Sequence, residues 1–364
     1  MPLVIAGAGM AGLVAGARAR ELGLEPLVLE KGSRPGGSML LSSGVVWRHR
    51  SFEDFRAECP GGDPALQRLI HDRLDDALDW LERLGAPVVA RETGNPLTVG
   101  RRFETSGLTE ALGRTAGEVH LRRTVQRGHE GPLVLATGGF PAALAERLGL
   151  ILRANPWSTG DGLWLARGRG AAIAGDLDEF YGRNLPAPPA RVGEEGFVPL
   201  AQLYGRQALV VNLDGVAFGP DPPSWSETDL AQATARQSWG RAWYVVDGRA
   251  LAHPDVAGQV AAAEEAGGEV RRADTVGGLA LELPPSDKLV EPPFAAVLVQ
   301  AAVTQTMGGI RVDDHARVLR EDSSVIDDLY AAGADAGGIS TGGYSSGLAA
   351  ALVLGLAAAE AAAA

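Results

Sequence analysis

The sequence predicts an α/β fold, in which helices cover a parallel sheet and a smaller α+β segment is inserted late in the chain. Three observations lead to this prediction. An apolar strand, a glycine-rich turn and a helix open the chain at 3–22, and a second apolar strand follows at 27–30. Proline-rich stretches at 186–190 and 291–293 enclose a segment whose residue pattern differs from that of the rest of the chain. Strands alternating with helices are typical of a parallel sheet.

Composition limits the possible functions. The chain has 364 residues, 46% of them hydrophobic, which excludes a disordered protein and is enough for a sizeable core. The net charge of −12 argues against binding to nucleic acid, which requires a basic face. The single cysteine, Cys59, excludes an internal disulfide, and the histidines show no metal-binding spacing. The start lacks a signal-peptide pattern and the apolar tail is too short to span a bilayer, so we expect a cytoplasmic protein.

The opening turn carries three glycines in the spacing of a dinucleotide-binding unit. Gly7 allows the tight turn, Gly9 lets backbone N–H groups approach a pyrophosphate, and Gly12 lets the helix pack on the strand. The helix N-terminus, at Met10 and Ala11, offers free N–H donors to the phosphates. Glu30 ends the second strand, where a carboxylate accepts hydrogen bonds from a ribose. Strand, turn, helix and acid together predict a Rossmann unit.

The residues after Glu30 indicate which dinucleotide is bound. Residues 31–38 read Lys-Gly-Ser-Arg-Pro-Gly-Gly-Ser. This stretch resembles the second glycine pair of the flavoprotein superfamily that includes glutathione reductase. In that superfamily the pair lets the chain pass close to the pyrophosphate and ribityl group of FAD. The resemblance therefore implies FAD rather than NAD.

Later segments narrow the resemblance to one family. Its motifs are matched in order by Ser38–Trp47, by Leu133–Phe140, by Thr-Gly-Asp-Gly at 159–162, and by Thr306–Ile310 followed by Leu329–Gly338. The chain resembles a compact member of the fumarate reductase/succinate dehydrogenase flavoprotein family, which includes 3-ketosteroid dehydrogenases. The resemblance implies a glutathione-reductase-like Rossmann FAD-binding domain in two parts, 1–185 and 300–364, with an inserted α+β capping domain at 186–299.

The same resemblance implies how FAD is held. Asp335 is expected to bind the ribityl chain, Asp161 to contact FAD, Val125 to meet the adenine, and the backbone at Gly347 and Leu348 to meet the flavin pyrimidine. We expect FAD to be non-covalent, because the stretch after the second glycine pair has no histidine or cysteine. The full set of expected FAD contacts is Gly7, Gly9, Met10, Ala11, Gly12, Glu30, Lys31, Gly37, Ser38, Ser43, Gly44, Val125, Thr137, Gly138, Asp161, Asp335, Gly347 and Leu348.

The family's reaction moves a hydride between a substrate carbon and flavin N5. Dicarboxylate-binding members use histidines and arginines at places that here fall near Asn184–Leu185, Thr304–Gln305, Glu227–Thr228 and Gly342. Without those cations two buried substrate carboxylates would cost several kcal/mol. We therefore expect a fairly apolar, carbonyl-containing substrate that is not a dicarboxylate.

Tyrosines take the catalytic role in the 3-ketosteroid dehydrogenase branch, which makes Tyr344 and Tyr181 the catalytic candidates here. Buried tyrosines more often only bind core polar groups, and that reading stays open. Further candidates for lining the substrate site are Arg183, Asn184, Gln305 and Ser345.

Two alternatives stay open: a flavin amine oxidase, and a flavin-binding protein without turnover. The direction of catalysis and the substrate are also open. Electrons are expected to pass to or from a separate donor, acceptor or oxygen.

Overall fold

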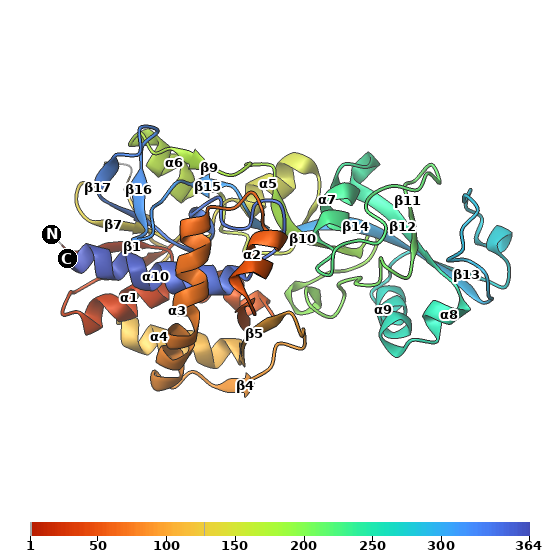
Figure 1. The fold of residues 1–364 in the computed structure, drawn as a ribbon, viewed down its shortest axis with the longest axis horizontal. Coiled ribbons are helices and arrows are strands. Elements are labelled where there is room, and N and C mark those ends of the chain that lie inside the picture. Colours follow the sequence, from red (N-terminus) through yellow and green to blue (C-terminus); the bar gives the residue numbers. More distant parts are fainter. Residues whose placement is uncertain (1, 127) are drawn as a thin grey trace. The chain divides into compact units, whose positions relative to one another are not determined.

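The computed structural model describes residues 2–126 and 128–364. The chain forms two compact units (Figure 1), which are described separately. The first unit contains residues 1–143, 154–180 and 305–364. The second contains Leu144–Arg153 and Tyr181–Thr304. The segment 186–299 lies within the second unit, which also takes in 144–153, because β8 (Ile151–Leu152) pairs with the long strand β14 (Phe294–Thr306).

A six-stranded sheet forms the centre of the first unit. Its order is β16-β17-β7-β1-β2-β6, and β1 pairs in parallel with both β2 and β7, so that Ile5 lies between Val28 and Val134. These three side chains are fully buried, which explains why each strand reads as an uninterrupted apolar run. The strands are β1 (Val4–Ala6), β2 (Leu27–Glu30), β6 (Val119–Leu121), β7 (Leu133–Leu135), β16 (Arg317–Leu319) and β17 (Val325–Ala331).

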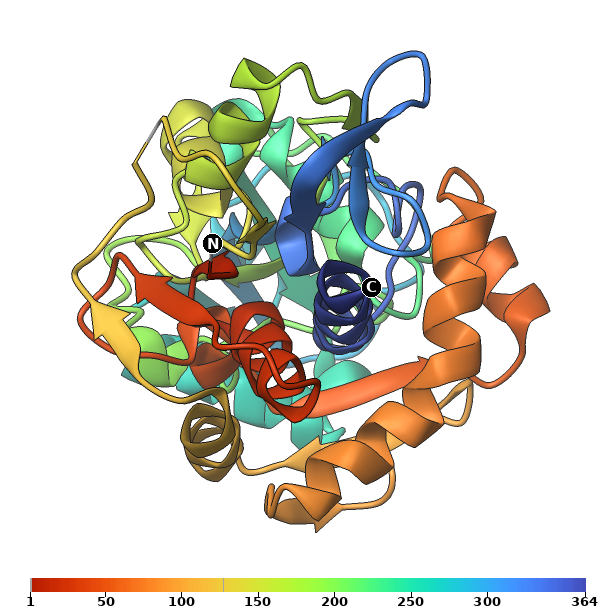
Figure 2. The same cartoon turned by 90° about the vertical axis from the view of Figure 1, so that its left-hand side faces the viewer.

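Helices cover this sheet. The C-terminal helix α10 packs against both α1 and α3 (Figure 2), and its small residues allow the close approach: a Cβ on Gly355 would lie 2.7 Å from the Ala11 carbonyl oxygen. The helices of this unit are α1 (Met10–Glu21), α2 (Phe52–Glu58), α3 (Pro64–Arg83), α4 (Thr105–Ala116), α6 (Asp161–Gly168), α10 (Gly347–Ala363) and the 3₁₀ turns η1 (Gly37–Leu41) and η5 (Gly333–Asp335). Helix α5 (Pro141–Leu148) begins with residues of the first unit and ends with residues of the second.

The start of α3 follows its sequence signals. Asp63 accepts hydrogen bonds from Ala65 N at 2.8 Å and Leu66 N at 3.2 Å, and Pro64 occupies the first turn. Apolar residues recur mostly every three or four positions over 66–84, which predicts one apolar face of an amphipathic helix, and leucines of that face such as Leu74 and Leu78 are buried. The predicted amphipathic core helix is confirmed.

One predicted strand is shorter than expected. The sequence predicts a strand over 120–125, whereas β6 ends at Leu121. Arg122 takes a left-handed φ of 54°, which interrupts the strand geometry, although Arg122 N and Arg123 N still donate to the Gly32 and Glu30 carbonyls. Val125 consequently lies outside the strand, although its side chain still packs against the core of the first unit.

Two small sheets complete the first unit. The antiparallel order β3-β5-β4 places Val45–His49 beside Thr98–Phe103, and β15 pairs with β9. The remaining strand bounds are β3 (Val45–His49), β4 (Val88–Ala90), β5 (Thr98–Phe103), β9 (Ile173–Ala174) and β15 (Gly309–Ile310).

The second unit is an α+β structure built on the order β10-β14-β12-β11, with β13 and β8 also pairing with β14. Successive β12 side chains enter opposite apolar clusters: Tyr244 packs with Val260 of α9, and Trp243 packs with Leu298 of β14. The predicted hairpin turn at Asn212–Gly215 is present. The other elements of the second unit are β10 (Phe180–Pro186), β11 (Leu209–Val211), α7 (Thr228–Ala235), β12 (Arg241–Val246), α8 (Gly248–Leu251), α9 (Pro254–Glu265), β13 (Val270–Ala273) and the 3₁₀ turns η2 (Glu194–Gly196), η3 (Ser238–Gly240) and η4 (Val276–Leu279).

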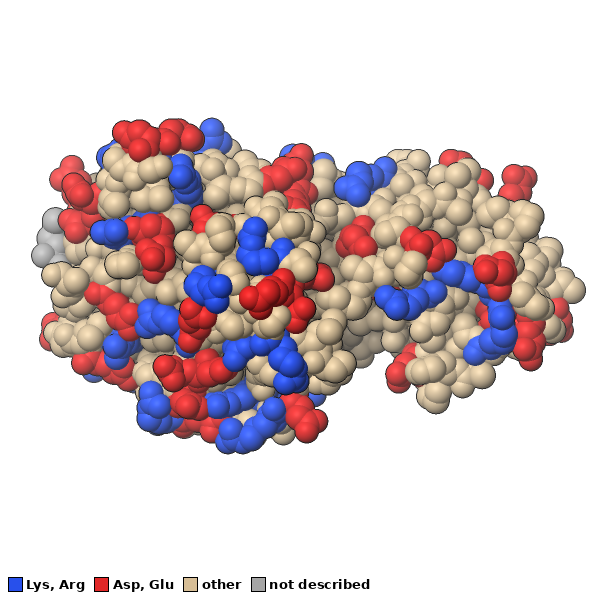
Figure 3. Space-filling model, in the orientation of Figure 1, with Lys and Arg blue, Asp and Glu red and all other residues tan. Residues whose placement is uncertain are grey.

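Among the described residues, no helix combines the length and the apolar character needed to cross a bilayer. On the face shown in Figure 3, acidic and basic side chains alternate over the first unit. Ion pairs of the first unit include Arg101 with Asp79 at 2.5 Å and Arg73 with Glu360 at 2.9 Å.

Candidate functional site

The two glycine turns of the first unit lie side by side. Gly36 N donates to the Ala8 carbonyl oxygen at 2.7 Å, and a Cβ on Gly37 would lie 3.1 Å from Gly9 Cα. The opening turn is equally tight inside, because a Cβ on Gly12 would lie 1.9 Å from the Gly7 carbonyl oxygen. Side chains are therefore excluded where the two turns and α1 meet.

The turn is less crowded at Gly9. Apart from its own chain neighbours, the nearest described atom to a Cβ on Gly9 would be Gly37 Cα, at 4.0 Å, an ordinary van der Waals distance. The first turn of α1 begins at Met10 and Ala11, whose side chains are buried while the helix N-terminus supplies N–H donors and a positive dipole end. A gap bounded by glycine backbone and helix N–H groups is what a pyrophosphate requires. These residues fit the phosphates of a dinucleotide.

Glu30 anchors the adjoining turn. Its side chain is buried, with Oε2 accepting from Ala8 N at 2.8 Å and Oε1 accepting from Gly32 N at 2.6 Å. A carboxylate has about four acceptor positions, so two remain for ribose hydroxyls. The carboxylate thus fixes the phosphate turn and keeps capacity for the expected ribose contact.

A second polar cluster joins the ends of β7 and β17. Asp335 is 1% exposed, and it accepts hydrogen bonds from Thr137 N, from Thr137 Oγ1 at 2.9 Å and from Gly139 N at 3.3 Å. Burial raises the pKa of Asp335 to about 6, and these hydrogen bonds act in the opposite direction. A Cβ on Gly162 would lie 2.8 Å from Asp335 Oδ1, and one on Gly138 would lie 2.6 Å from Ser158 Oγ.

Asp161 and Lys31 lie apart from this cluster. Lys31 Nζ contacts Asp161 Oδ2 at 2.9 Å and Thr159 Oγ1 at 2.7 Å, at the exposed side of the turn. In the Thr-Gly-Asp-Gly motif it is therefore Gly162, not Asp161, that packs on Asp335. The ion pair ties this motif to the end of β2.

Ser38, Ser43 and Gly44, which are also expected to contact FAD, are each tied to another segment of the first unit. Ser38 Oγ accepts from Asn155 N at 3.0 Å, which links the second glycine pair to the segment before the Thr-Gly-Asp-Gly motif. The Ser43 carbonyl accepts from Arg102 Nε at 3.1 Å, and Gly44 takes a φ of 72° where a Cβ would lie 2.2 Å from the Phe103 carbonyl oxygen.

The N-terminus of α10 is capped and crowded. Ser346 Oγ accepts from Ala349 N at 3.2 Å, and a Cβ on Gly347 would lie 1.9 Å from Gln305 Oε1. Ser345 Oγ lies 2.5 Å from Ser340 Oγ. The structure thus brings Gln305 and Ser345 to the helix end that begins at Gly347 and Leu348.

Tyr344 belongs to an aromatic group on the loop before α10. Its ring meets Trp47 edge-on at 5.4 Å, and its carbonyl oxygen lies 3.4 Å from His49 Nε2. Burial lowers the pKa of His49, so its imidazole is neutral at pH 7. Glu179 meets the same loop, because its Oε1 accepts from Gly342 N at 2.7 Å. Burial raises the pKa of Glu179, and none of the described residues offers its Oε2 a hydrogen-bond partner.

The other candidates lie in the second unit. The Arg183 guanidinium sits 4.8 Å from the centre of the Tyr181 ring and donates to the Ser226 carbonyl. Asn184 is buried and donates to Tyr244 Oη at 2.8 Å and Thr234 Oγ1 at 3.0 Å. Its amide nitrogen is therefore committed to the core of this unit.

Glu227 is a functional candidate of the second unit that residue patterns did not single out. Its Oε1 accepts from Gly205 N at 2.9 Å, while Oε2 is buried and finds no hydrogen-bond partner among the described residues. Burial raises its pKa to about 7, with Arg183 opposing the shift. Its backbone has a left-handed φ of 52°. The sequence around Glu227 resembles an ordinary helix start. It predicts neither the burial of the Glu227 side chain nor its left-handed φ.

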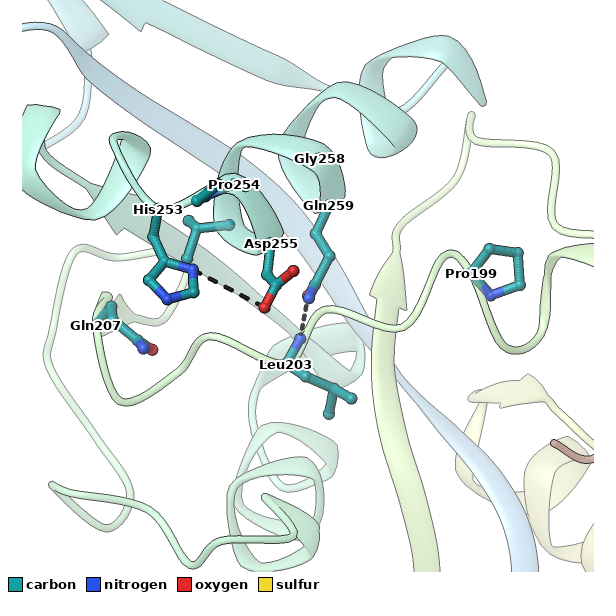
Figure 4. Close-up of a pocket in the computed structure, with 9 residues that line it drawn as sticks. Pro199, Leu203, Gln207, His253, Pro254, Asp255, Gly258 and Gln259 are labelled. Carbon is teal, nitrogen blue, oxygen red and sulfur yellow. Dashed lines mark hydrogen bonds and ion pairs between the residues drawn. The ribbon is translucent and has the colours of Figure 1, made fainter. Parts of the chain in front are cut away.

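A groove of about 520 Å³ lies at the start of α9 (Figure 4). His253 Nδ1 lies 3.9 Å from Asp255 Oδ2 there, and both side chains are exposed, in agreement with a solvent-facing histidine. The groove is lined by Pro199, Leu203, Gln207, His253, Pro254, Asp255, Val256, Gly258 and Gln259.

Asp313, Asp314 and His315 bring one potential ligand atom each within 4.8 Å of one another. The Asp313 carboxylate already accepts from His315 N at 3.0 Å and pairs with Arg317 at 2.7 Å. The group is a turn at the surface.

Comparison with known proteins agrees with this geometry. The model of the FAD binding domain family matches residues 3–130 and 110–348. The chain is 25% identical to the fumarate reductase (cytochrome) of Shewanella frigidimarina over 93% of this chain and 72% of that protein. It is also 47% identical to the NADH:acrylate oxidoreductase of Vibrio harveyi, over 15% of this chain and 6% of that protein.

Solved structures share the fold. The open conformation of a flavocytochrome c3 fumarate reductase aligns with a TM-score of 0.73 at 21% identity, covering 100% of this chain and 78% of that one. The 3-ketosteroid-Δ4-(5α)-dehydrogenase of Rhodococcus jostii RHA1 aligns with a TM-score of 0.70 at 20% identity, covering 99% and 96%. The expected fold and cofactor are confirmed, and the chain belongs to the FAD binding domain family as an FAD-dependent oxidoreductase.

Proposed function

We propose that this enzyme desaturates or reduces a carbon–carbon bond beside a carbonyl group, in a fairly apolar substrate that is not a dicarboxylate. Non-covalent FAD supplies the chemistry of hydride transfer at its N5 atom. The observation that carries the proposal is the loop before α10, where Tyr344 packs on Trp47 and Glu179 holds Gly342 N.

This loop suits an apolar substrate better than an anionic one. The partly exposed Tyr344 ring is backed by the buried Trp47, and burial lowers the pKa of His49 beside them, which favours its neutral form. The Glu179 carboxylate occupies the neighbourhood of Gly342, where dicarboxylate-binding relatives of the expected family carry an arginine. A substrate carboxylate there would meet another carboxyl group instead of a cation, which is unfavourable in a partly buried site.

Tyrosine is our candidate for binding or protonating the carbonyl-activated substrate. Tyr344 would donate its phenolic hydrogen to a substrate oxygen or exchange a proton with the carbon next to it. With an ordinary pKa near 10, a tyrosine is a better hydrogen-bond donor than a base at neutral pH. We assign a substrate-lining role to Gln305, Ser345 and the Tyr181–Arg183 pair, and a positioning role to Asn184.

The proposal includes a cytoplasmic location and a separate electron donor or acceptor, or oxygen. Its chemistry is tested without knowing the physiological partner. Oxidised holoenzyme is mixed anaerobically with cyclic 3-ketones, with succinate and with amines, and flavin bleaching is followed. Photoreduced holoenzyme is mixed with 4-androstene-3,17-dione, the ligand in the similar steroid dehydrogenase structure, with other enones and with fumarate.

We expect the ketones to bleach the flavin or the enones to reoxidise it, and succinate and fumarate to do neither at comparable rates. Turnover of fumarate or succinate at ordinary flavoenzyme rates contradicts the proposal. Flavin bleaching by amines alone, with peroxide released once oxygen is admitted, would favour the amine oxidase alternative. A reduced flavin that resists every enone and quinone would favour a protein without turnover.

A further inference from the structure

Trp157 is a large apolar side chain in an unusual position. It is 47% exposed, yet its indole lies directly over the turn after β2. A Cβ on Gly32 would lie 2.8 Å from Trp157 Cδ1 and 2.9 Å from Glu30 Oε1. The indole edge and the carboxylate expected to hold the adenosine ribose are therefore neighbours across Gly32.

The segment that carries Trp157 is fixed at both ends. Trp157 N donates to Asn155 Oδ1 at 3.1 Å, and Asn155 N donates to Ser38 Oγ at 3.0 Å. On the other side, Thr159 Oγ1 accepts from Lys31 Nζ at 2.7 Å. These contacts bind the segment to the second glycine pair and to the end of β2. An exposed aromatic ring on so constrained a backbone is prearranged for a ligand.

A second apolar side chain meets Glu30 from the neighbouring strand. Leu121 pairs with Glu30 in the β2–β6 register and is 39% exposed. Uncovered apolar surface beside a ribose-binding carboxylate suits a flat, weakly polar ring system. Adenine has such a ring, and bases gain substantial free energy by stacking on aromatic side chains.

We propose that Trp157 is the surface on which the adenine ring of bound FAD stacks. FAD would cover the indole, so that the exposed fraction of Trp157 falls on binding. Stacking on Trp157 would strengthen the binding of the adenosine half of the cofactor and would not change the chemistry at the flavin.

The test measures binding of FAD and of ADP to the apoprotein. ADP carries adenosine and a pyrophosphate but no flavin, and its binding is read by displacement of FAD. Trp157→Ala is expected to raise the Kd for both ligands by a similar factor, between about 5-fold and 150-fold. Trp157→Phe keeps an aromatic face and is expected to stay within about 3-fold of the wild type. Trp157→Leu keeps apolar bulk without that face and is expected to resemble Trp157→Ala.

Trp164 provides the matched control. It is 62% exposed, lies in α6 of the same unit, and contacts Arg167 at 5.4 Å from its ring centre. Trp164→Ala is expected to leave both dissociation constants unchanged. Wild-type ADP affinity in Trp157→Leu or in a folded Trp157→Ala would overturn the proposal, as would loss of FAD affinity with ADP affinity intact. If Trp157→Ala does not fold, the contrast between Trp157→Phe and Trp157→Leu decides it.

Discussion

The Thr137 hydroxyl donates to Asp335 Oδ1 at 2.9 Å, although the two residues are 198 positions apart in the sequence. The bond closes the site, because it joins the ends of the adjacent strands β7 and β17 at the place where the cofactor's ribityl chain is expected.

Asp335→Asn should weaken both folding and FAD binding. Thr137 N donates to Oδ2 and Gly139 N to Oδ1, so an amide nitrogen in place of either oxygen would face an N–H group, where only an acceptor is satisfied. A buried donor left without an acceptor costs about 1–3 kcal/mol. Thermal unfolding and the Kd for FAD measure the two effects. Asp327→Asn, on the exposed face of β17, is the control and should change neither. A wild-type Kd for FAD in Asp335→Asn would remove Asp335 from the binding site.

Two glycine substitutions should separate folding from phosphate binding. Gly9→Ala adds a methyl group that meets Gly37 Cα only at 4.0 Å, so the apoprotein should keep its stability. Its Kd for FAD should rise at least 10-fold, which is a loss of about 1.4 kcal/mol of binding free energy. Gly12→Ala places a methyl group 1.9 Å from the Gly7 carbonyl and should destabilise the apoprotein as well.

Urea unfolding of the apoproteins and FAD titration check both results. Gly113→Ala in α4, with nothing described within 4 Å, serves as the control and should be neutral or slightly stabilising. Unchanged FAD affinity in Gly9→Ala would argue that the pyrophosphate lies elsewhere.

Stability should depend on pH through Glu227. Its folded-state pKa of about 7 exceeds the ordinary value of 4.5, so the folded state binds the proton more tightly than the unfolded state. Ionisation therefore destabilises the fold progressively from pH 4.5 to pH 7, by about 3 kcal/mol in total, and the effect is absent below pH 4.5.

Glu227→Gln removes this ionisation and should make stability less dependent on pH over that window. Urea unfolding of wild type and variant at pH 5 and pH 8 gives the difference. Glu264→Gln, an exposed partner of Arg272, is the control and should keep the wild-type profile. Equal pH profiles for wild type and Glu227→Gln would show that Glu227 ionises normally.

Tyr344→Phe should reduce turnover by roughly 100-fold to 10,000-fold if the phenol takes part in proton transfer. FAD affinity should not change, because the ring contact with Trp47 does not need the hydroxyl. Rapid-mixing measurement of flavin bleaching by the best ketone separates chemistry from binding. Tyr330→Phe, whose hydroxyl lies 3.4 Å from the Ala361 carbonyl, is the control. Wild-type bleaching rates in Tyr344→Phe would restrict Tyr344 to packing.

Several local features of the fold could be predicted from the sequence, because each depends on residues close by in the chain. The glycine spacing at 7–12, the strand at 27–30 and the Asp63 cap of α3 all depend on neighbours within a few residues. Helix α10 follows equally from a continuous apolar run. Where a local rule was misleading, as at Arg122, a single backbone angle ended the strand.

That strand, turn, helix and acid form a phosphate-binding unit could be predicted from the residues alone, because such units follow from short-range backbone chemistry. Which distant side chains meet could be known only from the folded chain. It joined Thr137 to Asp335, placed Asp161 with Lys31 at the surface, and put Trp157 over Gly32. Burial also decided the ionisation of Glu227 and Asp335, since desolvation depends on packing between segments distant in sequence.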